Sequence, residues 1–390
     1  MIQTNDRLGK LPPYLFAEID RKKKQLIEAG HKVLNLGIGD PDLPTPPHIV
    51  EALQKAAANP ATHHYPLGKG MASFRRTIAD YYRKHMDVSL SPDDEICVLI
   101  GSKEGIAHFP TAFLNPGDVT LVPEPGYPVY HIGTMLAGGT SHFMPLVEEN
   151  GFLPDLGAIP ENVVRRAGIL YLNYPNNPTA AFAPREYLTD AIAFAKKYDI
   201  IILYDAAYHE MYFQERPVSF LSLPGAKDVG IELHSLSKTY SMTGWRVGWA
   251  CGNRDLVAGL AKLKENIDSG TFDAIQIAGI EALGASQQCV EEMRAVYRGR
   301  KDILFAGLTR LGWKIREPKG TFYFWAKIPG GGNSIQTVNM LLEKAHIVCT
   351  PGIGFGPSGE GYVRFALTAP EAVLKEAIER LETNDVKRKA

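Results

Sequence analysis

Short apolar runs alternate with longer helical stretches through the middle of this sequence. The runs lie in residues 96–100, 119–122, 168–172, 200–204, 229–233 and 247–251, and residues 184–197 show the helical pattern between them. Nearly continuous apolar runs of this length are typical of strands that are buried on both faces. Their alternation with helices predicts an α/β fold with a mainly parallel, doubly wound sheet.

The pattern changes after about residue 285. A long helix over residues 285–300 would act as a connector, and strand-like runs follow at Ile315 and in residues 321–325, 347–349 and 362–366, before a final helix from about Pro370. We therefore predict a large domain over 46–285 and a smaller α+β domain over 286–390. Residues 1–45 would form an N-terminal arm and part of the small domain.

Composition and charge exclude several classes of function. The chain has 390 residues and a formal net charge of −1, with 42 basic and 43 acidic residues, so we expect no broad surface for nucleic acid or anionic lipid. No apolar run approaches the ~20 residues of a membrane helix, and the polar start favours a cytoplasmic protein that binds no membrane. The cysteines are too far apart for a disulfide framework or a metal site: Cys97, Cys251, Cys289 and Cys349.

Polar residues follow most of the expected strands, and ligands bind at the carboxyl ends of strands in open α/β sheets. Residues 101–105 open a helix whose free amides suit a phosphate, although an N-cap turn is the simpler interpretation. Tyr127 follows the second strand and the asparagine-rich loop 173–179 follows the third. Taken singly, packing and an ordinary turn would explain these two features.

An acid and an amine follow the two central strands. Asp205 ends the apolar run 200–204, where a carboxylate costs free energy unless it meets a positive charge or hydrogen-bond donors. A capping role or the protonated ring nitrogen of a cofactor would both explain this acid. The next strand leads to Ser235, Ser237 and Lys238. A lysine in this position can form a Schiff base with an aldehyde if burial or a neighbouring cation suppresses its charge.

Together these groups meet the requirements of pyridoxal phosphate, which needs an amine, an acid and an anchored phosphate. The motifs Asn176-Asn177-Pro178-Thr179, Asp205-x-x-Tyr208 and Ser235-x-Ser237-Lys238, with Arg246, resemble those of the fold-type I pyridoxal-phosphate enzymes, specifically the class I/II aminotransferases. The resemblance runs from about Asn35 to the C-terminal helix. It implies an aspartate aminotransferase-like fold, whose large domain has a sheet of the seven-stranded type and binds the cofactor.

The resemblance also implies a role for each motif residue. Lys238 would form the Schiff base and move the proton between Cα and C4′, and Asp205 would keep the ring nitrogen protonated. Asn177 and Tyr208 would bond the ring hydroxyl and lower the pKa of the Schiff base, and Tyr127 would stack on the ring. The phosphate would be bound by Ser102, Lys103, Ser235, Ser237 and Arg246.

Further residues would bind the substrate or the neighbouring subunit. Arg364 resembles the arginine that pairs bidentately with the substrate carboxylate, although a structural ion pair is the alternative interpretation. The expected substrate site is completed by Gly39, Asn177, Tyr14 and Ile38. Tyr65 resembles the tyrosine that reaches the cofactor phosphate of the neighbouring subunit, which implies a homodimer with shared active sites. We expect no metal, since the adjacent pair His63-His64 has poor spacing for one.

The N-terminal segments 6–8, 12–16 and 36–42 are most similar to LL-diaminopimelate aminotransferases. This similarity implies amino-group transfer between the diaminopimelate of lysine biosynthesis and a 2-oxo acid such as 2-oxoglutarate. Aminotransferases for alanine, aspartate or aromatic amino acids, and C–S β-lyases, share the cofactor residues and stay open as alternatives. A regulator that uses this fold only to sense amino acids would need a DNA-binding segment, and we expect none before residue 30. A nicotinamide dehydrogenase is disfavoured because the glycine run 352–356 lies in no strand–turn–helix unit.

Overall fold

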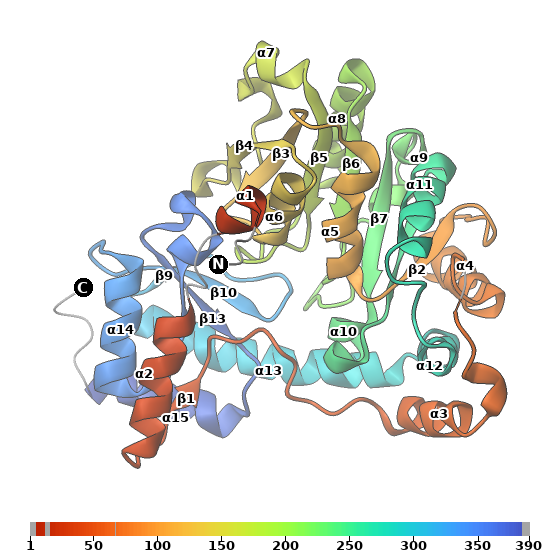
Figure 1. The fold of residues 1–390 in the computed structure, drawn as a ribbon. Coiled ribbons are helices and arrows are strands. Elements are labelled where there is room, and N and C mark those ends of the chain that lie inside the picture. The colour runs from red at the N-terminus through yellow and green to blue at the C-terminus, as the bar shows by residue number, and fades with distance from the viewer. Residues whose placement is uncertain (1–4, 12–15, 67, 384–390) are drawn as a thin grey trace.

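A seven-stranded sheet forms the centre of the computed structural model, which describes residues 5–11, 16–66 and 68–383 (Figure 1). Its strands follow the order β2-β8-β7-β6-β5-β3-β4. Neighbouring strands are parallel from β4 to β7, whereas β8 is antiparallel to both of its neighbours. The bounds are β2 Ile96–Leu99, β3 Val119–Glu124, β4 Thr140–Pro145, β5 Ala167–Asn173, β6 Ile201–Asp205, β7 Gly230–Ser235 and β8 Gly248–Gly252.

The predicted mainly parallel sheet is thus confirmed, and each expected apolar run is a strand within a few residues of its expected bounds. The sequence pattern missed β4. This strand lies at the edge of the sheet and pairs only with β3, and most of its side chains are exposed or half-buried. An edge strand with so little buried surface has no continuous apolar run to mark it.

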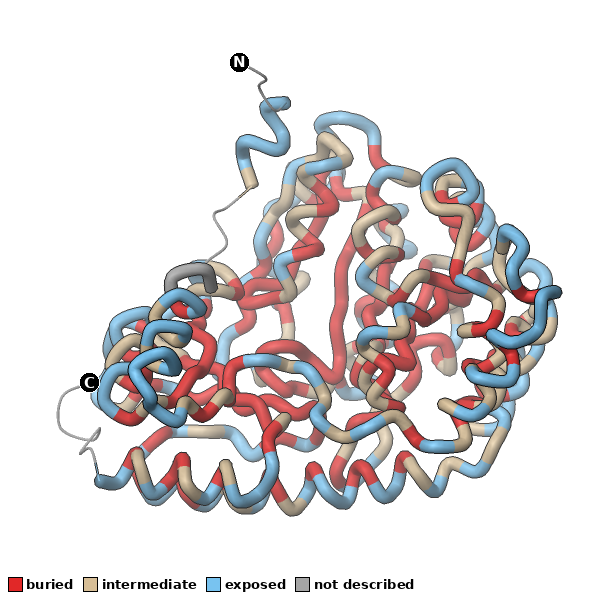
Figure 2. Tube along the Cα trace, turned by 60° about the horizontal axis from the view of Figure 1, so that its bottom comes forward, coloured by how far each residue is buried: buried red, intermediate tan, exposed pale blue. Residues whose placement is uncertain are grey.

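Helices cover both faces of this sheet and make a three-layer structure (Figure 1). One face is covered by α5 (Ser102–Phe113), α6 (Val129–Leu136) and α11 (Arg254–Glu265). The other is covered by α3 (Pro47–Ala57), α4 (Ala72–Met86), α8 (Arg185–Tyr198) and α12 (Asp273–Gly284). Figure 2 shows buried strands at the centre and helices whose outer sides are exposed. Each helix therefore presents one apolar side to the sheet.

Side chains along the central strands point alternately to the two faces of the sheet, and this decides which helix layer the last side chain of each strand meets. Tyr204 packs into the core on the α4 and α8 side, whereas Leu203 packs into the core on the α5 and α6 side. Because successive side chains of a strand point to opposite faces, Asp205 shares the face of Leu203. In β7 the same rule puts Ser235 on the face of Leu233. The acid and the serine are therefore directed toward α5 and α6.

The C-terminal part forms a second core around a four-stranded antiparallel sheet of order β12-β13-β10-β9. Its strands are β9 Lys314–Ile315, β10 Tyr323–Lys327, β12 Thr350–Pro351 and β13 Tyr362–Ala366, with β11 Ile347–Val348 pairing in parallel with β1 Leu34–Asn35. The helices of this part are α2 Phe16–Glu28, α14 Ser334–Ala345 and α15 Glu371–Thr383. The β1–β11 pair ties the N-terminal segment to this core.

The connector helix α13 spans Gln288–Arg310, so it begins later and extends further than expected. In Figure 1 it runs along the lower side of the structure, from the smaller sheet toward α10 and α12. The short helices are α1 Asp6–Gly9, α7 Glu161–Val164, α9 Ala226–Val229 and α10 Leu236–Thr239. Among the described residues, no helix is long and apolar enough to cross a membrane.

Candidate active site

Lys238 lies just beyond the carboxyl end of β7, in the short helix α10. Its Nζ donates a hydrogen bond to the main-chain carbonyl of Gly39 at 2.9 Å and lies 5.6 Å from the centre of the Phe322 ring. The pKa of the Lys238 amine is lowered to about 8, mainly by burial; Asp40 opposes this effect, and the cations Arg364 and Arg246 contribute to it. An amine with this pKa is partly neutral near pH 7, which is the state that attacks a carbonyl.

Asp205 ends β6 as a buried carboxylic acid. Its Oδ2 accepts a hydrogen bond from the Tyr130 hydroxyl at 2.8 Å, and its Oδ1 accepts one from the Ala207 amide at 3.1 Å. Burial raises the pKa of Asp205, while these two hydrogen bonds oppose the rise. Asn173 on the neighbouring strand also bonds the carbonyl of Asp205 at 2.8 Å and accepts the amide of Asn177 at 2.9 Å. This asparagine joins the loop of Asn177 to the strand of the acid.

A cradle for an anion lies at the start of α5. Gly101 has a φ of 79°, and a Cβ there would lie 2.6 Å from Nη2 of Arg246, so only glycine lets the guanidinium come this close. The first turn of α5, beginning at Ser102, offers amide groups and the positive end of the helix dipole. Ser235 and Ser237 lie at the end of β7 and the start of α10, where Oγ of Ser235 accepts the Ser237 amide at 3.1 Å.

Lys103 has an exposed side chain next to this cradle. The donor set of the cradle is one arginine, hydroxyls and helix amides, which is the chemistry that a phosphate requires. The carboxyl edge of the central strands therefore offers donors for a phosphate, near the ends of the strands that lead to Asp205 and Lys238.

Arg364 is a buried guanidinium in β13. Nη1 donates to Oδ1 of Asn177 at 2.8 Å, and Nη2 donates to the carbonyl of Gly37 at 2.9 Å. The guanidinium carbon lies 4.1 Å from the centre of the Tyr323 ring and 4.8 Å from that of Phe355. Both hydrogen-bond partners are neutral, and Nε has no partner among the described residues. Arg364 is thus a buried cation without a carboxylate partner in that part of the chain, unlike the structural ion pair that the sequence left open.

Two tyrosines complete the surroundings of Lys238 and Arg364. Tyr127 is half-buried and meets Tyr130 edge-on, with ring centres 5.8 Å apart. Tyr208 is buried, and its hydroxyl lies 2.9 Å from the hydroxyl of Tyr323. The sequence predicted Tyr127 and Tyr208, and the structure brings both to the carboxyl edge of the central strands.

Three other predicted residues are exposed or lie outside the described residues, so the structure of the single chain gives them no contact with the other site residues. Tyr65 is 82% exposed, and Ile38 is 52% exposed with its carbonyl accepting the Thr368 hydroxyl at 2.6 Å. Tyr14 lies outside the described residues. Gly39 is in place, because its carbonyl receives Lys238 and a Cβ there would overlap the hydroxyl of Tyr323.

Sequence reasoning missed Tyr130 and Tyr323. Tyr130 lies in the first turn of α6, three residues after Tyr127, and nothing in this spacing shows that its hydroxyl reaches Asp205. Tyr323 begins β10, where it continues an aromatic run that reads as ordinary core. No local signal separates its hydroxyl from those of other buried tyrosines.

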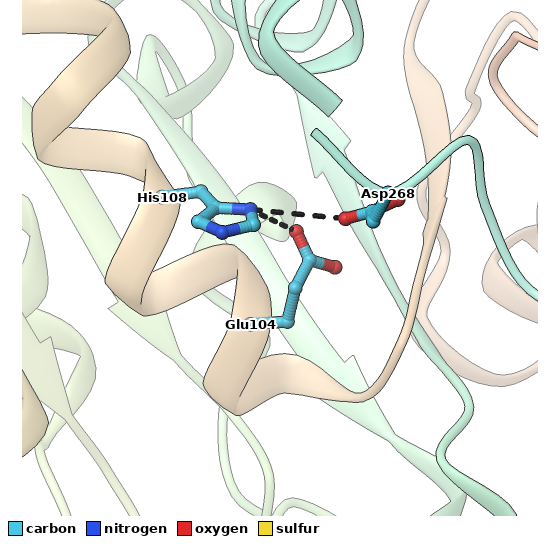
Figure 3. A group of neighbouring side chains, drawn as sticks. All are labelled: Glu104, His108 and Asp268. Atoms are coloured by element: carbon cyan, nitrogen blue, oxygen red, sulfur yellow. Dashed lines mark hydrogen bonds and ion pairs between the residues drawn. The ribbon is translucent and has the colours of Figure 1, made fainter. Parts of the chain in front are cut away.

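A cluster of ionisable side chains stands behind the anion cradle. Glu104 and His108 of α5 point toward Asp268 (Figure 3), and the possible ligand atoms of these three residues lie within 4.8 Å of one another. The ammonium of Lys264 bonds Glu104 at 2.8 Å and Asp268 at 3.1 Å, so a positive charge already occupies the cluster. Glu104 also accepts the amide of Ile100 at 3.0 Å. The cluster thus braces the turn that leads into α5.

Comparison with known proteins gives consistent matches. The family model described as aminotransferase class I and II matches residues 31–381. A protein of Syntrophobacter fumaroxidans named LL-diaminopimelate aminotransferase is 56% identical over 96% of this chain and 97% of its own length. One of the same name from Aquifex aeolicus is 55% identical over 98% and 99%. The substrate-bound structure of BacF from Bacillus subtilis covers 98% of both chains with a TM-score of 0.94 at 39% identity.

We expect Tyr130→Phe to raise the pKa of Asp205, because the carboxylate loses a donor that stabilises its charged form. An upward shift of about 1 pH unit corresponds to the loss of one hydrogen bond to a charged group. The shift would be measured in the ligand-free protein by carbon-13 NMR titration of labelled aspartates, with Asp205→Asn identifying the signal.

Tyr171→Phe is the matched control for this measurement. Its ring stacks on Tyr130 with centres 5.0 Å apart, but its buried hydroxyl has no hydrogen-bond partner among the described residues. Equal titration of Asp205 in the wild type and in Tyr130→Phe would contradict the role given to Tyr130.

Proposed function

The chain belongs to the class I and II aminotransferase family, and we propose that it transfers an amino group from LL-diaminopimelate to a 2-oxo acid such as 2-oxoglutarate. Membership of this family makes the protein a pyridoxal-phosphate-dependent aminotransferase. The observation that carries the proposal is the meeting of a partly neutral lysine, a buried acid and a buried arginine without a carboxylate partner. The diaminopimelate substrate rests on the relatives that carry this name at more than half identity.

The residues of the site fit pyridoxal phosphate. When bound, this cofactor supplies an electron sink that stabilises negative charge at the α-carbon of the substrate. Arg246, the serines 235 and 237 and the first turn of α5 would hold its phosphate, and the glycine at 101 lets the Arg246 guanidinium lie against the start of that turn. Asp205 would keep the ring nitrogen protonated, because a buried carboxylate is stabilised by an opposite charge and its two hydrogen bonds favour the charged form against the effect of burial. Tyr127 would cover one face of the ring.

Lys238 and Arg364 would act on the substrate itself. Arg364 would bind the α-carboxylate. Its Nε lacks a partner among the described residues, and the two groups that accept its hydrogen bonds are neutral. Lys238 Nζ would take the proton from the α-carbon, and its pKa of about 8 suits a base that works near neutral pH. Phe322 and the carbonyl of Gly39 orient the amine. Asn177 and Tyr208 would bond the ring hydroxyl.

Two separate cores support the predicted domain division, which we also propose. The core around the seven-stranded sheet is built mainly from residues between 49 and 290, and the second core from residues 19–36 and 297–381. Tyr208, Met211 and Phe213 are exceptions, since they belong to the large domain by sequence but pack into the second core. The segment after β6 would therefore join the two domains at the site.

The substrate is tested by following the visible absorbance of the cofactor-loaded protein while amino acids are added without an acceptor. We expect LL-diaminopimelate and glutamate to bleach the absorbance, because each would leave its amino group on the protein. Alanine, aspartate and phenylalanine should act much more slowly. Lys238→Ala serves as the control that cannot turn over.

The alternatives give different outcomes in this experiment. No response to LL-diaminopimelate together with a fast response to another amino acid would reject the substrate and keep the family. Release of pyruvate and ammonia from cystathionine without a 2-oxo acid would favour a C–S β-lyase.

The lowered pKa of Lys238 predicts how pH controls cofactor uptake. Only the neutral amine attacks the aldehyde, so the rate at which the apo-protein takes up pyridoxal phosphate should rise with pH and level off above pH about 9. An ordinary lysine would keep gaining reactivity up to pH about 10.5. The rate of Nα-acetyl-lysine in the same buffers corrects for ionisation of the aldehyde. A protein rate that rises in parallel with this model amine would contradict the lowered pKa.

We also propose a homodimer, supported by an exposed apolar surface near the cradle. Tyr65 is 82% exposed, and the nearby loop carries Ile267 at 54% and Phe272 at 39%. The ring of His63 lies 6.3 Å from that of Phe272, which places these loops side by side. Apolar side chains gathered in this way are typical of an interface.

The homodimer predicts twice the mass of one chain in light scattering after gel filtration. Ile267→Asp should shift the protein toward the monomer. It should also weaken cofactor binding, because Tyr65 would no longer reach the cofactor phosphate of the neighbouring subunit. Ile335→Asp is the control, since Ile335 is 37% exposed on α14 in the C-terminal part. A wild-type monomer at micromolar concentration would reject the proposal.

A further inference from the structure

Tyr323 contacts three parts of the site although no sequence motif marks it. It is buried at the start of β10, in the second core. Its ring lies against the guanidinium of Arg364, its hydroxyl fills the space above Gly39, and the same hydroxyl lies 2.9 Å from that of Tyr208. One side chain thus contacts the expected carboxylate-binding arginine, the segment that bonds Lys238, and the expected partner of the ring hydroxyl.

The ring of Tyr323 is held so that its hydroxyl meets Tyr208. Arg364 lies over its face at 4.1 Å, and the rings of Tyr208 and Phe322 meet it edge-on with centres 5.6 Å and 4.9 Å away. Its hydroxyl leaves no room for a side chain at Gly39. These neighbours contact the face, the edge and the hydroxyl of the Tyr323 ring and leave it one position. The packing therefore sets the hydrogen bond to Tyr208.

The direction of this hydrogen bond follows from what Tyr208 must do. Burial raises the pKa of the Tyr208 phenol well above its usual range, so the hydroxyl keeps its proton and can donate it. A hydroxyl has one proton, and if Tyr208 gives it to the cofactor's ring oxygen, the proton between the two tyrosines must come from Tyr323. A donor that itself accepts a hydrogen bond becomes a stronger donor.

We propose that Tyr323 is a positioning residue whose hydroxyl donates to Tyr208 and thereby strengthens the hydrogen bond from Tyr208 to the ring oxygen of the cofactor. This inference rests on the proposed function, because it requires pyridoxal phosphate in the site. The competing interpretation is that Tyr323 only fills the core, in which case its ring would matter and its hydroxyl would not. Tyr323→Phe keeps the ring and removes the hydroxyl, so it separates the two.

The readout is the pH at which the visible absorbance of the bound cofactor is half changed. A hydrogen bond donated to the ring oxygen disperses the negative charge of that oxygen. The oxygen then attracts the proton on the neighbouring nitrogen less strongly. Loss of the hydrogen bond therefore moves the midpoint to higher pH. We expect Tyr208→Phe to give the larger upward shift and Tyr323→Phe one of about 0.5 pH unit. The variant Tyr208→Phe/Tyr323→Phe should match Tyr208→Phe alone, since Tyr323 acts only through Tyr208.

Tyr297→Phe is the matched control. Tyr297 is a buried tyrosine of the same core, its ring lies 5.6 Å from Phe322, and its hydroxyl has no hydrogen-bond partner among the described residues. Its midpoint should equal that of the wild type. Circular dichroism and thermal unfolding check that each variant is folded. If Tyr323→Phe does not fold, 3-fluorotyrosine at position 323 tests the same bond, and its more acidic hydroxyl should move the midpoint downward.

Two results would overturn the inference. One is that Tyr323→Phe has the same pH midpoint as the wild type, while the midpoint of Tyr208→Phe is shifted. The other is a shift in the variant with both substitutions that equals the sum of the two single shifts, which would mean that Tyr323 does not act through Tyr208. A wild-type protein that shows no visible absorbance with pyridoxal phosphate would instead reject the proposed function, so the two failures are distinguishable.

Discussion

The buried guanidinium of Arg364 holds the site together, because it links its own strand to two segments that are far away in the sequence. It lies on β13, donates to Asn177 in the loop after β5, and donates to the carbonyl of Gly37 in the N-terminal segment. A buried cation is costly unless it is hydrogen-bonded, and neutral acceptors and aromatic faces compensate it only in part. The same contacts that make its burial tolerable therefore fix the positions of Asn177 and of the segment that leads to Gly39. An incoming carboxylate would supply the charge that these neutral partners lack.

The central sheet provides the other half of the arrangement through strand alternation. Because Asp205 and Ser235 end neighbouring strands and share one face, an acid and a hydroxyl reach the layer of α5 and α6 together. The opposite face of β7 carries Glu232, which is fully buried and accepts hydrogen bonds from Tyr82, Ser219 and the amide of Leu221. Burial would raise the pKa of Glu232, but it is lowered to about 2, mainly by His234, whose Nε2 lies 2.6 Å from the carboxylate, and further by His209 and Tyr82. One strand therefore carries a satisfied structural charge on one face and the groups of the site on the other.

The sequence could predict the features that depend on local pattern. Runs that are buried on both faces gave the central strands, and the polar residues after them gave Asp205, Asn177 and Lys238, because the carboxyl edge of a parallel sheet gathers such residues wherever they lie in the chain. The resemblance to class I/II aminotransferases and the α/β fold are confirmed, while the roles of the site residues stay predictions. The edge strand β4 was missed because it buries little. Tyr130 and Tyr323 were missed because their importance lies in one hydroxyl contact across the fold, which leaves no trace in spacing or composition.

The charges around Lys238 explain why a chain of nearly balanced charge can favour anionic ligands. Burial is the largest cause of the lowered pKa of this lysine, and Arg246 and Arg364 add to it. Each of the two arginines also faces an expected anion position, one at the cradle of α5 and one beside Asn177. The groups that would hold the phosphate and the carboxylate therefore also add to the effect of burial on the amine. Selecting anions and preparing a nucleophile are, in this site, two consequences of one electrostatic arrangement, so a substitution at either arginine should change both.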